Sequence, residues 1–398
     1  MRNADFLNDS FFRSLDSSTL EVERAQMLPP LCYTDREFFE FEKEAIFTRE
    51  WLCVGREAWA RNPGDYFTTS HIGEPIMVVR NRDGVLQAFS TVCQHRAMLV
   101  AEGRGNTRAF ICPYHHWTYS LDGSLIGAPA MEKTCDFDPK TIRLGRFGLE
   151  VWLGFIFINF DLNAPPLAPR LETLRKALDH WDLEHVDELP HGEQLRKCPW
   201  NWKVQLENSN DGYHANRLHK GPVHDLCPSD MVSFPELPPD SACYFRYNRT
   251  TDLDVGFNPT RKAILPIFPQ LTVEERHRFL FANIPPTFQL FARPDWATFT
   301  IFQADGPEEM TFQRTWMVAP GAMSEPLFKE RLDIYIATSA TIGEQDRHVD
   351  AMVQIGLRSR FAHRGRYSWQ ESAQLGLNNW LVSRYKSHWD RLNGHRAA

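Results

Sequence analysis

The sequence predicts an α+β protein in which a small all-β domain precedes a larger domain of antiparallel strands and helices. Short strand patterns separated by turns fill residues 64–160, the proline-rich segment "DLNAPPLAP" follows, and helical and strand patterns mix after it. We expect three parts: an N-terminal helical segment at 1–48 that packs on the last domain, the all-β domain at 49–163, and the larger domain at 164–398.

The individual elements follow from local patterns. Thr34 and Glu37 form a capping box, which predicts a helix over 34–48. Alternating or continuous apolar runs predict strands in the first domain at "DYFTTS", "PIMVVR", "VLQAFSTV", "AFIC", "TYSL" and "LEVWLGFIFINF". In the second domain we expect strands at "CYFRY", "TFQLFA", "ATFTIFQ" and "TFQRTWMVA", and helices at 170–186, 200–219, 324–342, 345–358 and 370–393.

Composition excludes several classes of protein. The 398 residues carry a net charge of −7 without a basic block, so nucleic acid is not an expected partner. The N-terminus has no secretory pattern, and the longest apolar run, 151–160, is too short to cross a bilayer and predicts one buried strand. We therefore expect a cytoplasmic protein with reduced cysteines. Six of the cysteines are expected in the core: Cys32, Cys53, Cys135, Cys198, Cys227 and Cys243.

Two loops of the β domain each offer one thiol and one imidazole. Cys93 and His95 stand in "TVCQHRAML", and Cys112 and His115 in "ICPYHHWTY". Unrelated core residues and a structural Cys₂His₂ zinc site are the alternatives. One thiol and one imidazole per loop suit two metal atoms, with both thiolates on one iron and both imidazoles on the other, which is the Rieske [2Fe–2S] pattern. Neutral imidazoles raise the reduction potential above that of a four-thiolate cluster.

A second cluster of possible ligands lies in "NWKVQLENSNDGYHANRLHKGP". His214 and His219 are five residues apart, about 140° around an ideal helix, so one of them must lie in a distorted turn. Asp211 precedes His214 by three residues and would share its helix face. Two histidines and a carboxylate form the facial triad of non-haem Fe(II) oxygenases. Alone, the spacing fits solvated helix histidines equally well.

The order of these motifs resembles the oxygenase (α) component of the Rieske non-haem iron oxygenases. Cys93-x-His95, sixteen residues, and Cys112-x-x-His115-x-Trp117 are similar to their Rieske motif, and "ENSNDGYHANRLH" is similar to their iron-binding segment. Met98 and Tyr114 stand where respiratory Rieske proteins have disulfide cysteines. Ala97 and His116 replace the family's glycines, so we expect a different backbone there. The resemblance implies that His115, rather than His116, binds the cluster.

The resemblance also implies roles in the second domain. His214 and His219 would bind a mononuclear iron, together with Asp346 from "GEQDRHVDAMVQIGLRS", where Gln354 follows; Asp350 and Glu344 are the alternatives for the third ligand. Asp211 would link the iron site to a neighbouring subunit's Rieske histidine in a homotrimer, with Asn208 and Tyr213 as supporting residues. Four aromatic residues could line an apolar pocket: Phe288, Phe291, Trp296 and Phe299.

The implied activity is O₂-dependent hydroxylation of an aromatic or other small organic substrate, by mono- or dioxygenation. Electrons from NAD(P)H would arrive through a partner reductase or ferredoxin, because the chain shows no dinucleotide fingerprint. The alternatives are an oxidative N- or O-demethylase, a quaternary-amine monooxygenase, and an electron-transfer or zinc-binding protein without oxygenase activity.

Overall fold

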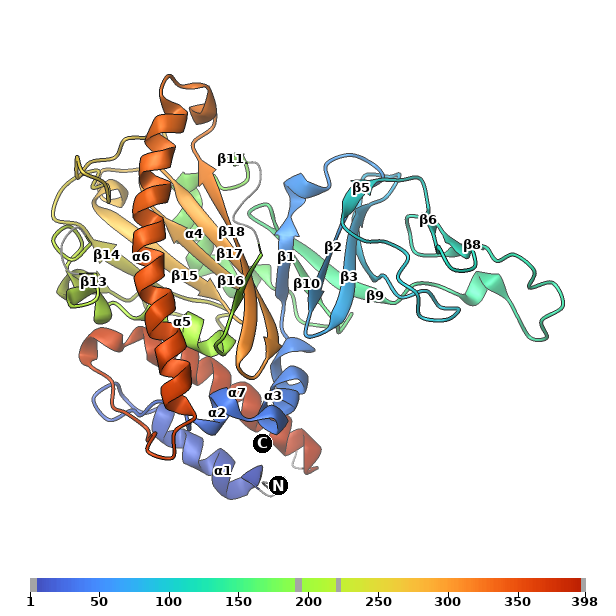
Figure 1. Ribbon diagram of the computed structural model, residues 1–398, viewed down its shortest axis with the longest axis horizontal. Coiled ribbons are helices and arrows are strands. Elements are labelled where there is room, and N and C mark those ends of the chain that lie inside the picture. Colours follow the sequence, from blue (N-terminus) through green and yellow to red (C-terminus); the bar gives the residue numbers. More distant parts are fainter. Residues whose placement is uncertain (1–5, 190–194, 220–222, 395–398) are drawn as a thin grey trace. The chain divides into compact units, whose positions relative to one another are not determined.

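The computed structural model describes residues 6–189, 195–219 and 223–394. It divides the chain into two compact units, Phe47–Ala168 and a second that joins Met1–Ile46 to Pro169–Ala398. The N-terminal segment is therefore part of the larger unit, although the whole smaller unit lies between this segment and Pro169 in the sequence. Figure 1 follows the chain by colour.

The smaller unit is built on antiparallel strands. One sheet has the order β1-β10-β9-β4-β3-β2-β5, and a second has the order β6-β7-β8. Their bounds are β1 Leu52–Arg56, β2 Asp65–His71, β3 Glu74–Arg80, β4 Leu86–Ser90, β5 Arg104–Asn106, β6 Phe110–Ile111, β7 Thr118–Tyr119, β8 Leu125–Gly127, β9 Arg146–Trp152 and β10 Phe155–Asn159. Buried Phe89, Phe110 and Tyr119 form one core with Cys93 and Cys112, so both Cys/His loops rest on packed strands.

The apolar run at 151–160 is a hairpin rather than the single strand that we expected. Leu153 and Gly154 both have positive φ, 47° and 75°, and they join β9 to β10. Two residues in the left-handed region make a hairpin turn whose twist matches that of the paired strands. The prediction failed because apolar residues continue through the turn, so hydrophobicity alone does not mark it.

The larger unit contains an antiparallel sheet of order β11-β18-β17-β16-β15-β14-β13, with β12 also paired to β18. The bounds are β11 Asp187–Glu188, β12 Arg196–Cys198, β13 Val232–Ser233, β14 Tyr244–Arg249, β15 Arg278–Ile284, β16 Phe288–Ala292, β17 Ala297–Gly306 and β18 Glu309–Val318. The four predicted strands correspond to β14, β16, β17 and β18, whereas β15 was not predicted. This strand pairs with β14, which is distant in the sequence, and forms a hairpin with β16.

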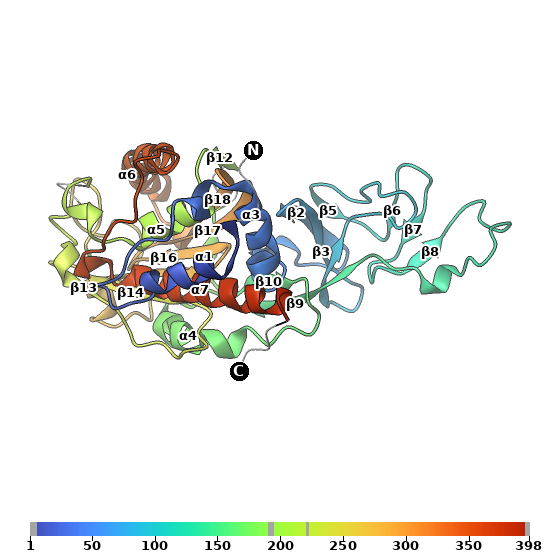
Figure 2. The same cartoon turned by 90° about the horizontal axis from the view of Figure 1, so that it is seen from below.

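The helices lie around this sheet. Their bounds are α1 Asp9–Ser14, α2 Leu31–Thr34, α3 Arg36–Glu42, α4 Glu172–Leu178, α5 Trp202–Asn210, α6 Phe328–Leu357 and α7 Ala373–Leu392. In both views α6 crosses one face of the sheet, while α4 lies on the other face (Figures 1 and 2).

The structure corrects the predicted bounds of α6 and α3. The expected break between 342 and 345 is absent from α6, because one internal glycine, Gly343, costs only about 1 kcal/mol in a helix that packing holds elsewhere. The predicted cap at Thr34 is replaced by Asp35, whose carboxylate accepts from the N–H groups of Glu37 and Phe38. The helix over 34–48 is thus α3 followed by a π-helical turn, Lys43–Phe47.

A buried ion pair ties the N-terminal segment to the larger unit. Lys203 Nζ on α5 lies 2.7 Å from Glu42 Oε1 on α3, and both side chains are fully buried. Trp202 Nε1 donates to Glu42 Oε2 at 3.1 Å, and the Tyr385 hydroxyl on α7 also donates to this carboxylate. Buried charges need such partners, so α3, α5 and α7 are fixed together at this point.

None of the eight cysteines, all of which lie in the described ranges, forms a disulfide, and seven of them are buried. Cys135 is exposed, which corrects its expected place in the core; its loop, between β8 and β9, carries no strand to bury it. No helix in the described parts of the chain is long and apolar enough to cross a membrane.

Candidate metal centres

The two Cys/His loops of the smaller unit share one backbone design. In the first loop the N–H of Ala97 donates to Cys93 O at 3.0 Å, and the Cys93 N–H donates to Met98 O. In the second loop the N–H of His116 donates to Cys112 O at 2.9 Å, and the Cys112 N–H donates to Trp117 O. The same hydrogen bonds therefore close both loops around their cysteines, which makes the two loops equivalent halves of one site.

The expected change of backbone at the glycine replacements does not occur. Ala97 has φ 56° and His116 has φ 58°, so both residues occupy the left-handed region that glycine would adopt freely. The hydrogen bonds that close each loop impose this conformation despite the cost of a Cβ atom, about 1–2 kcal/mol per residue. The His116 side chain is exposed, whereas Nδ1 of His115 is buried.

The side chains in these loops fit an iron–sulfur cluster. Cys93 and Cys112 are buried, and the ring centroids of His95 and His115 lie 4.5 Å apart. The Nδ1 atoms of both histidines are buried without a hydrogen-bond partner among the described residues. Buried polar atoms are normally satisfied, so two unpartnered nitrogens beside two buried thiols are the donor set that a Rieske cluster requires.

Neighbouring aromatic groups hold these ligands in place. The His95 ring stacks on Trp117 with centroids 4.8 Å apart and planes at 10°. The Tyr119 hydroxyl lies 3.3 Å from Cys93 Sγ and accepts a hydrogen bond from the Gln94 N–H at 3.0 Å. A hydroxyl that donates to a thiolate stabilises its negative charge, so Tyr119 can tune the electronics of the site.

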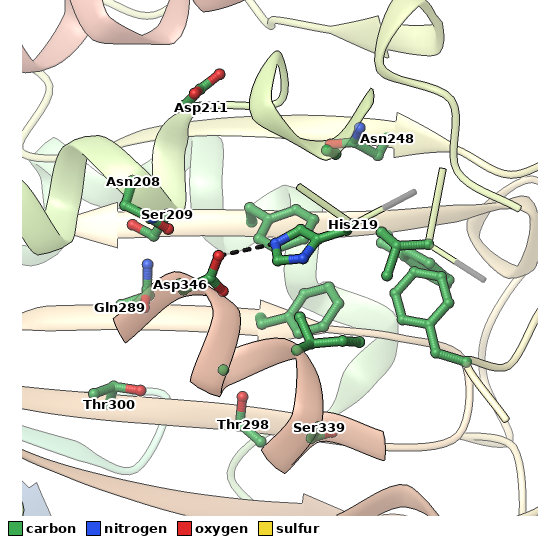
Figure 3. Close-up of a pocket in the computed structure, with 18 of the residues that line it drawn as sticks. Asn208, Ser209, Asp211, His219, Asn248, Gln289, Thr298, Thr300, Ser339 and Asp346 are labelled. Carbon is green, nitrogen blue, oxygen red and sulfur yellow. Dashed lines mark ion pairs between the residues drawn. The ribbon is translucent and has the colours of Figure 1, made fainter. Parts of the chain in front are cut away.

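In the larger unit, three side chains converge from two distant segments. His219 Nε2 lies 2.9 Å from Asp346 Oδ1 (Figure 3). His214 Nε2 lies 3.7 Å from the same oxygen. The two Nε2 atoms are 3.2 Å apart, and the three ligand atoms all lie within 4.8 Å of one another. This is a two-histidine, one-carboxylate set on α6 and the segment after α5, and its chemistry suits Fe(II).

The outer nitrogen of each histidine has its own acceptor. His219 Nδ1 lies 2.8 Å from Gln345 Oε1, and His214 Nδ1 lies 3.1 Å from Asp211 Oδ2. Donation from Nδ1 leaves each Nε2 free as a metal ligand and fixes the orientation of the ring. Gln345 was missed in the sequence, where only its position beside Asp346 hints at it.

The local backbone explains how the histidines meet. The helix expected over 200–219 ends at Asn210 on α5; Asp211 follows in an extended conformation, and a short 3₁₀ turn runs over His214–Asn216. Asp211 therefore reaches His214 across a turn, and not along a helix face. Leaving the helix lets His219 turn back toward His214, which an ideal helix would place about 140° away.

The other predicted residues of this segment occupy different places. Asn208 hydrogen-bonds to the Asp350 carboxyl, whereas the Tyr213 side chain is half exposed and does not line the cavity described below. Burial and the charge of Asp346 raise the pKa of Asp350 to about 8, although Asn208 opposes the shift. Glu344 is exposed and pairs with Arg347. Of the three acids considered, Asp346 has its carboxylate beside both histidines.

Gln354 has a structural position. It is fully buried on α6, its Oε1 accepts from the Asn201 N–H at 2.9 Å, and its Nε2 donates to Tyr33 O at 3.1 Å. It thereby joins α6 to the start of α5 and to α2, which fixes the spacing between Asp346 and the two histidines.

A cavity of about 200 Å³ opens beside these three side chains. One face of the sheet forms its wall, and alternation along each strand decides which residues reach it. Phe291 and Trp296 line the cavity, as do the polar residues Gln289, Thr298 and Thr300 that Figure 3 labels.

The other two predicted pocket residues are not among the lining residues. Phe288 and Phe299 are fully buried, one position out of phase with Gln289 and Thr298 on their strands. Consecutive strand residues point to opposite faces, so these two rings belong to the core on the α4 side.

Comparison with known proteins identifies the family. Residues 50–145 match the Rieske [2Fe-2S] domain, and residues 177–387 match the family described as ring hydroxylating alpha subunit (catalytic domain). The chain belongs to the Rieske non-haem iron oxygenases. It is a terminal oxygenase subunit, with a [2Fe–2S] domain and a catalytic non-haem iron domain, and it takes electrons from a reductase or ferredoxin.

Similar Rieske oxygenases differ in their substrates. The carnitine monooxygenase oxygenase subunit of Acinetobacter pittii is 30% identical over 84% of this chain and 86% of its own length. The benzene 1,2-dioxygenase subunit alpha of Pseudomonas putida is 34% identical over 59% of this chain and 54% of its own length. A solved quaternary ammonium Rieske monooxygenase is 26% identical with a TM-score of 0.78, covering 95% of this chain and 99% of that one.

Proposed function

We propose that His214, His219 and Asp346 hold the mononuclear iron at which this oxygenase hydroxylates its substrate. The observation that carries the proposal is the convergence of three potential ligand atoms within 4.8 Å, at the edge of a cavity. The positions of Gln345 and Asp211 support it, because each accepts from the Nδ1 atom of one histidine and leaves Nε2 for the metal.

The [2Fe–2S] cluster is proposed to bind Cys93, His95, Cys112 and His115. The unpartnered Nδ1 atoms of the two histidines support this set, and the exposure of His116 speaks against a ligand role for that residue. When bound, the cluster supplies electrons and the mononuclear iron supplies O₂ activation. The aromatic wall formed by Phe291 and Trp296 excludes water and holds the substrate beside the three ligands.

Electron transfer between subunits is part of the proposal. Asp211 would accept a hydrogen bond from His115 of the neighbouring subunit while it holds His214 of its own, in a closed head-to-tail homotrimer. A solved relative whose description names inter-subunit electron transfer supports this arrangement. We place the enzyme in the cytoplasm, where the Cys93 and Cys112 thiols stay reduced for cluster assembly.

The proposed substrate is an aromatic or other small organic molecule, since Phe and Trp rings from several strands line the cavity. A quaternary-amine monooxygenase is the second candidate, because carnitine monooxygenase subunits match most of this chain. An ¹⁸O₂ experiment with the holoenzyme and a reductase separates the reactions by product mass. Two labelled atoms indicate dioxygenation, and one indicates monooxygenation. Benzene, naphthalene and carnitine are suitable first substrates.

The ligand assignment is tested by three variants of α6. Asp346→Ala should lose mononuclear iron and product formation while the Rieske absorbance remains. Asp350→Asn and Glu344→Gln serve as controls that should keep the iron. Normal iron content in Asp346→Ala, with loss in either control, would show that the wrong acid has been chosen.

A further inference from the structure

Two buried arginines line the cavity, and the acids nearest to them act only from a distance: Asp211 on Arg246, and Asp295 on Arg293. Arg246 on β14 is 4% exposed and Arg293, just after β16, is 1% exposed. Within the described ranges, neither forms an ion pair. Arg246 Nη2 donates to Ser209 O at 3.3 Å and Arg293 Nη2 to Val255 O at 3.3 Å, while both Nε atoms are buried without a partner. A guanidinium has five N–H donors, so most of this capacity is unused.

The nearest acids already have other partners. Asp211 binds His214, and Asp346 lies against His219. Asp295 accepts from the Tyr335 hydroxyl at 2.6 Å, and from the backbone near Ile264. Asp211 and Asp295 therefore compensate the two guanidinium charges only in part. A buried charge without a direct ion pair is costly, so the cavity is electrostatically suited to an added anion.

Arg246 lies beside the segment that carries Asp211 and His214. A Cβ atom on Gly212, the residue after Asp211, would lie 3.8 Å from Arg246 Nη1. Across the sheet Arg246 pairs in register with Phe281, Phe281 with Phe291, and Phe291 with Thr298, all of which line the cavity. One row of side chains therefore presents a cation followed by two rings. Burial lowers the pKa of Arg246 to about 10, which still leaves it protonated at neutral pH.

We propose that this oxygenase acts on a small carboxylate, and that Arg246 binds the carboxylate group while Phe281 and Phe291 pack against a flat apolar body. The inference rests on the proposed function, in which this cavity holds the substrate beside the iron. The planar guanidinium matches a carboxylate through paired N–H donors. Arg293 adds positive potential farther along the same wall.

The same geometry disfavours a quaternary ammonium group. Such groups bind the faces of aromatic rings, but the guanidinium of Arg246 already lies 4.1 Å from the Phe281 centroid. Arg293 lies 4.5 Å from the ring centroids of Phe257 and Trp296. A cation in this cavity would meet positive charges where its aromatic contacts should be.

Calorimetry tests the proposal by measuring the dissociation constants of three probes. The enzyme is oxidised, fully loaded with iron and kept under anaerobic conditions. The probes are benzoate, its neutral isostere benzamide, and phenyltrimethylammonium. We expect benzoate to bind at least about tenfold tighter than benzamide, equivalent to about 1.4 kcal/mol, and the cation to bind weakest. Equal affinity for benzoate and benzamide, or tighter binding of the cation, would overturn the proposal.

Variants identify the group that recognises the charge. Arg246→Met should remove the preference for benzoate and leave benzamide binding unchanged, and Arg246→Lys should retain part of it. Arg278→Met is the matched control, because Arg278 stacks on Tyr247, pairs with Glu274 and does not line the cavity. If the preference survives in Arg246→Met, a group other than Arg246 recognises the charge and the proposal is wrong. If Arg246→Met does not fold, the wild-type comparison and Arg246→Lys still decide.

The outcomes also separate this inference from the proposed function. Loss of mononuclear iron in Asp350→Asn rather than Asp346→Ala would refute the ligand assignment. Absence of charge selectivity in an enzyme with normal iron and normal O₂-dependent turnover would refute the carboxylate inference alone.

Discussion

Asp211 Oδ2 lies 3.1 Å from His214 Nδ1, on the side of the imidazole that faces away from Asp346. The other carboxylate oxygen, Oδ1, accepts from the Tyr213 N–H. Each carboxylate oxygen has two lone pairs, so Asp211 can accept a further hydrogen bond without releasing His214. Asp211 is therefore placed to support the proposed ligand His214 through its outer nitrogen, and not to bind the metal as a third ligand.

For Asp211→Asn we expect both metals to remain while the reduced Rieske cluster fails to pass its electron in a single turnover. A mixing experiment sharpens this test. Asp211→Asn keeps its cluster and His115→Ala keeps its iron site, so co-assembled trimers of these two inactive variants should regain activity at one kind of interface. Activity of Asp211→Asn by itself, or of a strictly monomeric enzyme by light scattering, would contradict the bridge.

The left-handed residues of the Rieske loops predict a gain in stability on substitution by glycine. Ala97→Gly and His116→Gly should each raise the free energy of unfolding by roughly 0.5–1 kcal/mol, because relief of the Cβ strain exceeds the added chain entropy. The midpoint of denaturant unfolding, followed by the Rieske absorbance, measures this. Ala109→Gly is the control; Ala109 has no positive φ and should lose stability instead. Destabilisation by all three changes would show that the loops are unstrained.

The buried pair of Lys203 and Glu42 predicts a large loss of stability when only one partner is removed. Lys203→Met should lower the free energy of unfolding by about 3–5 kcal/mol, since it leaves the fully buried Glu42 carboxylate uncompensated. The double variant Lys203→Met/Glu42→Gln should recover part of that loss. Chemical denaturation monitored by tryptophan fluorescence reports both. A single variant as stable as the wild type would mean that other donors to Glu42 suffice.

Glu207 on α5 predicts a specific pH dependence of stability. Burial raises its pKa to about 7, although the Tyr33 hydroxyl and Lys203 oppose the shift. Because the folded pKa exceeds the unfolded value, the folded state binds more protons, and this residue makes stability fall as pH rises from about 4.5 to 7. Glu207→Gln should remove this pH-dependent part of the free energy of unfolding, which amounts to at most about 3 kcal/mol. Identical pH–stability curves for variant and wild type would contradict it.

The sequence alone determined the parts of this protein whose ligands are close together in the chain. Cys93 with His95 and Cys112 with His115 lie within single loops, so their spacing predicted a Rieske cluster before any fold was known. His214 and His219 also lie in one short segment, so they could be predicted as iron ligands from the sequence. The strand and helix patterns on either side of the proline-rich segment predicted the two-domain architecture. The strand patterns predicted β14, β16, β17 and β18 of the larger sheet, but not β11, β12, β13 or β15. Turns inside apolar runs, such as Leu153-Gly154, were missed because no polar residue marks them.

Tertiary structure decided everything that depends on which segments meet. Local pattern could not choose among Asp346, Asp350 and Glu344, because all three are acids on one helix; packing of α6 against α5 brings Asp346 to the histidines and buries Asp350 beside Asn208. The cavity wall also depends on the fold. Strand register turns Arg246 and Phe291 toward the cavity and Phe288 toward the buried core on the opposite face of the sheet. The charge next to the proposed iron site is therefore set by strand pairing that no single segment of sequence contains.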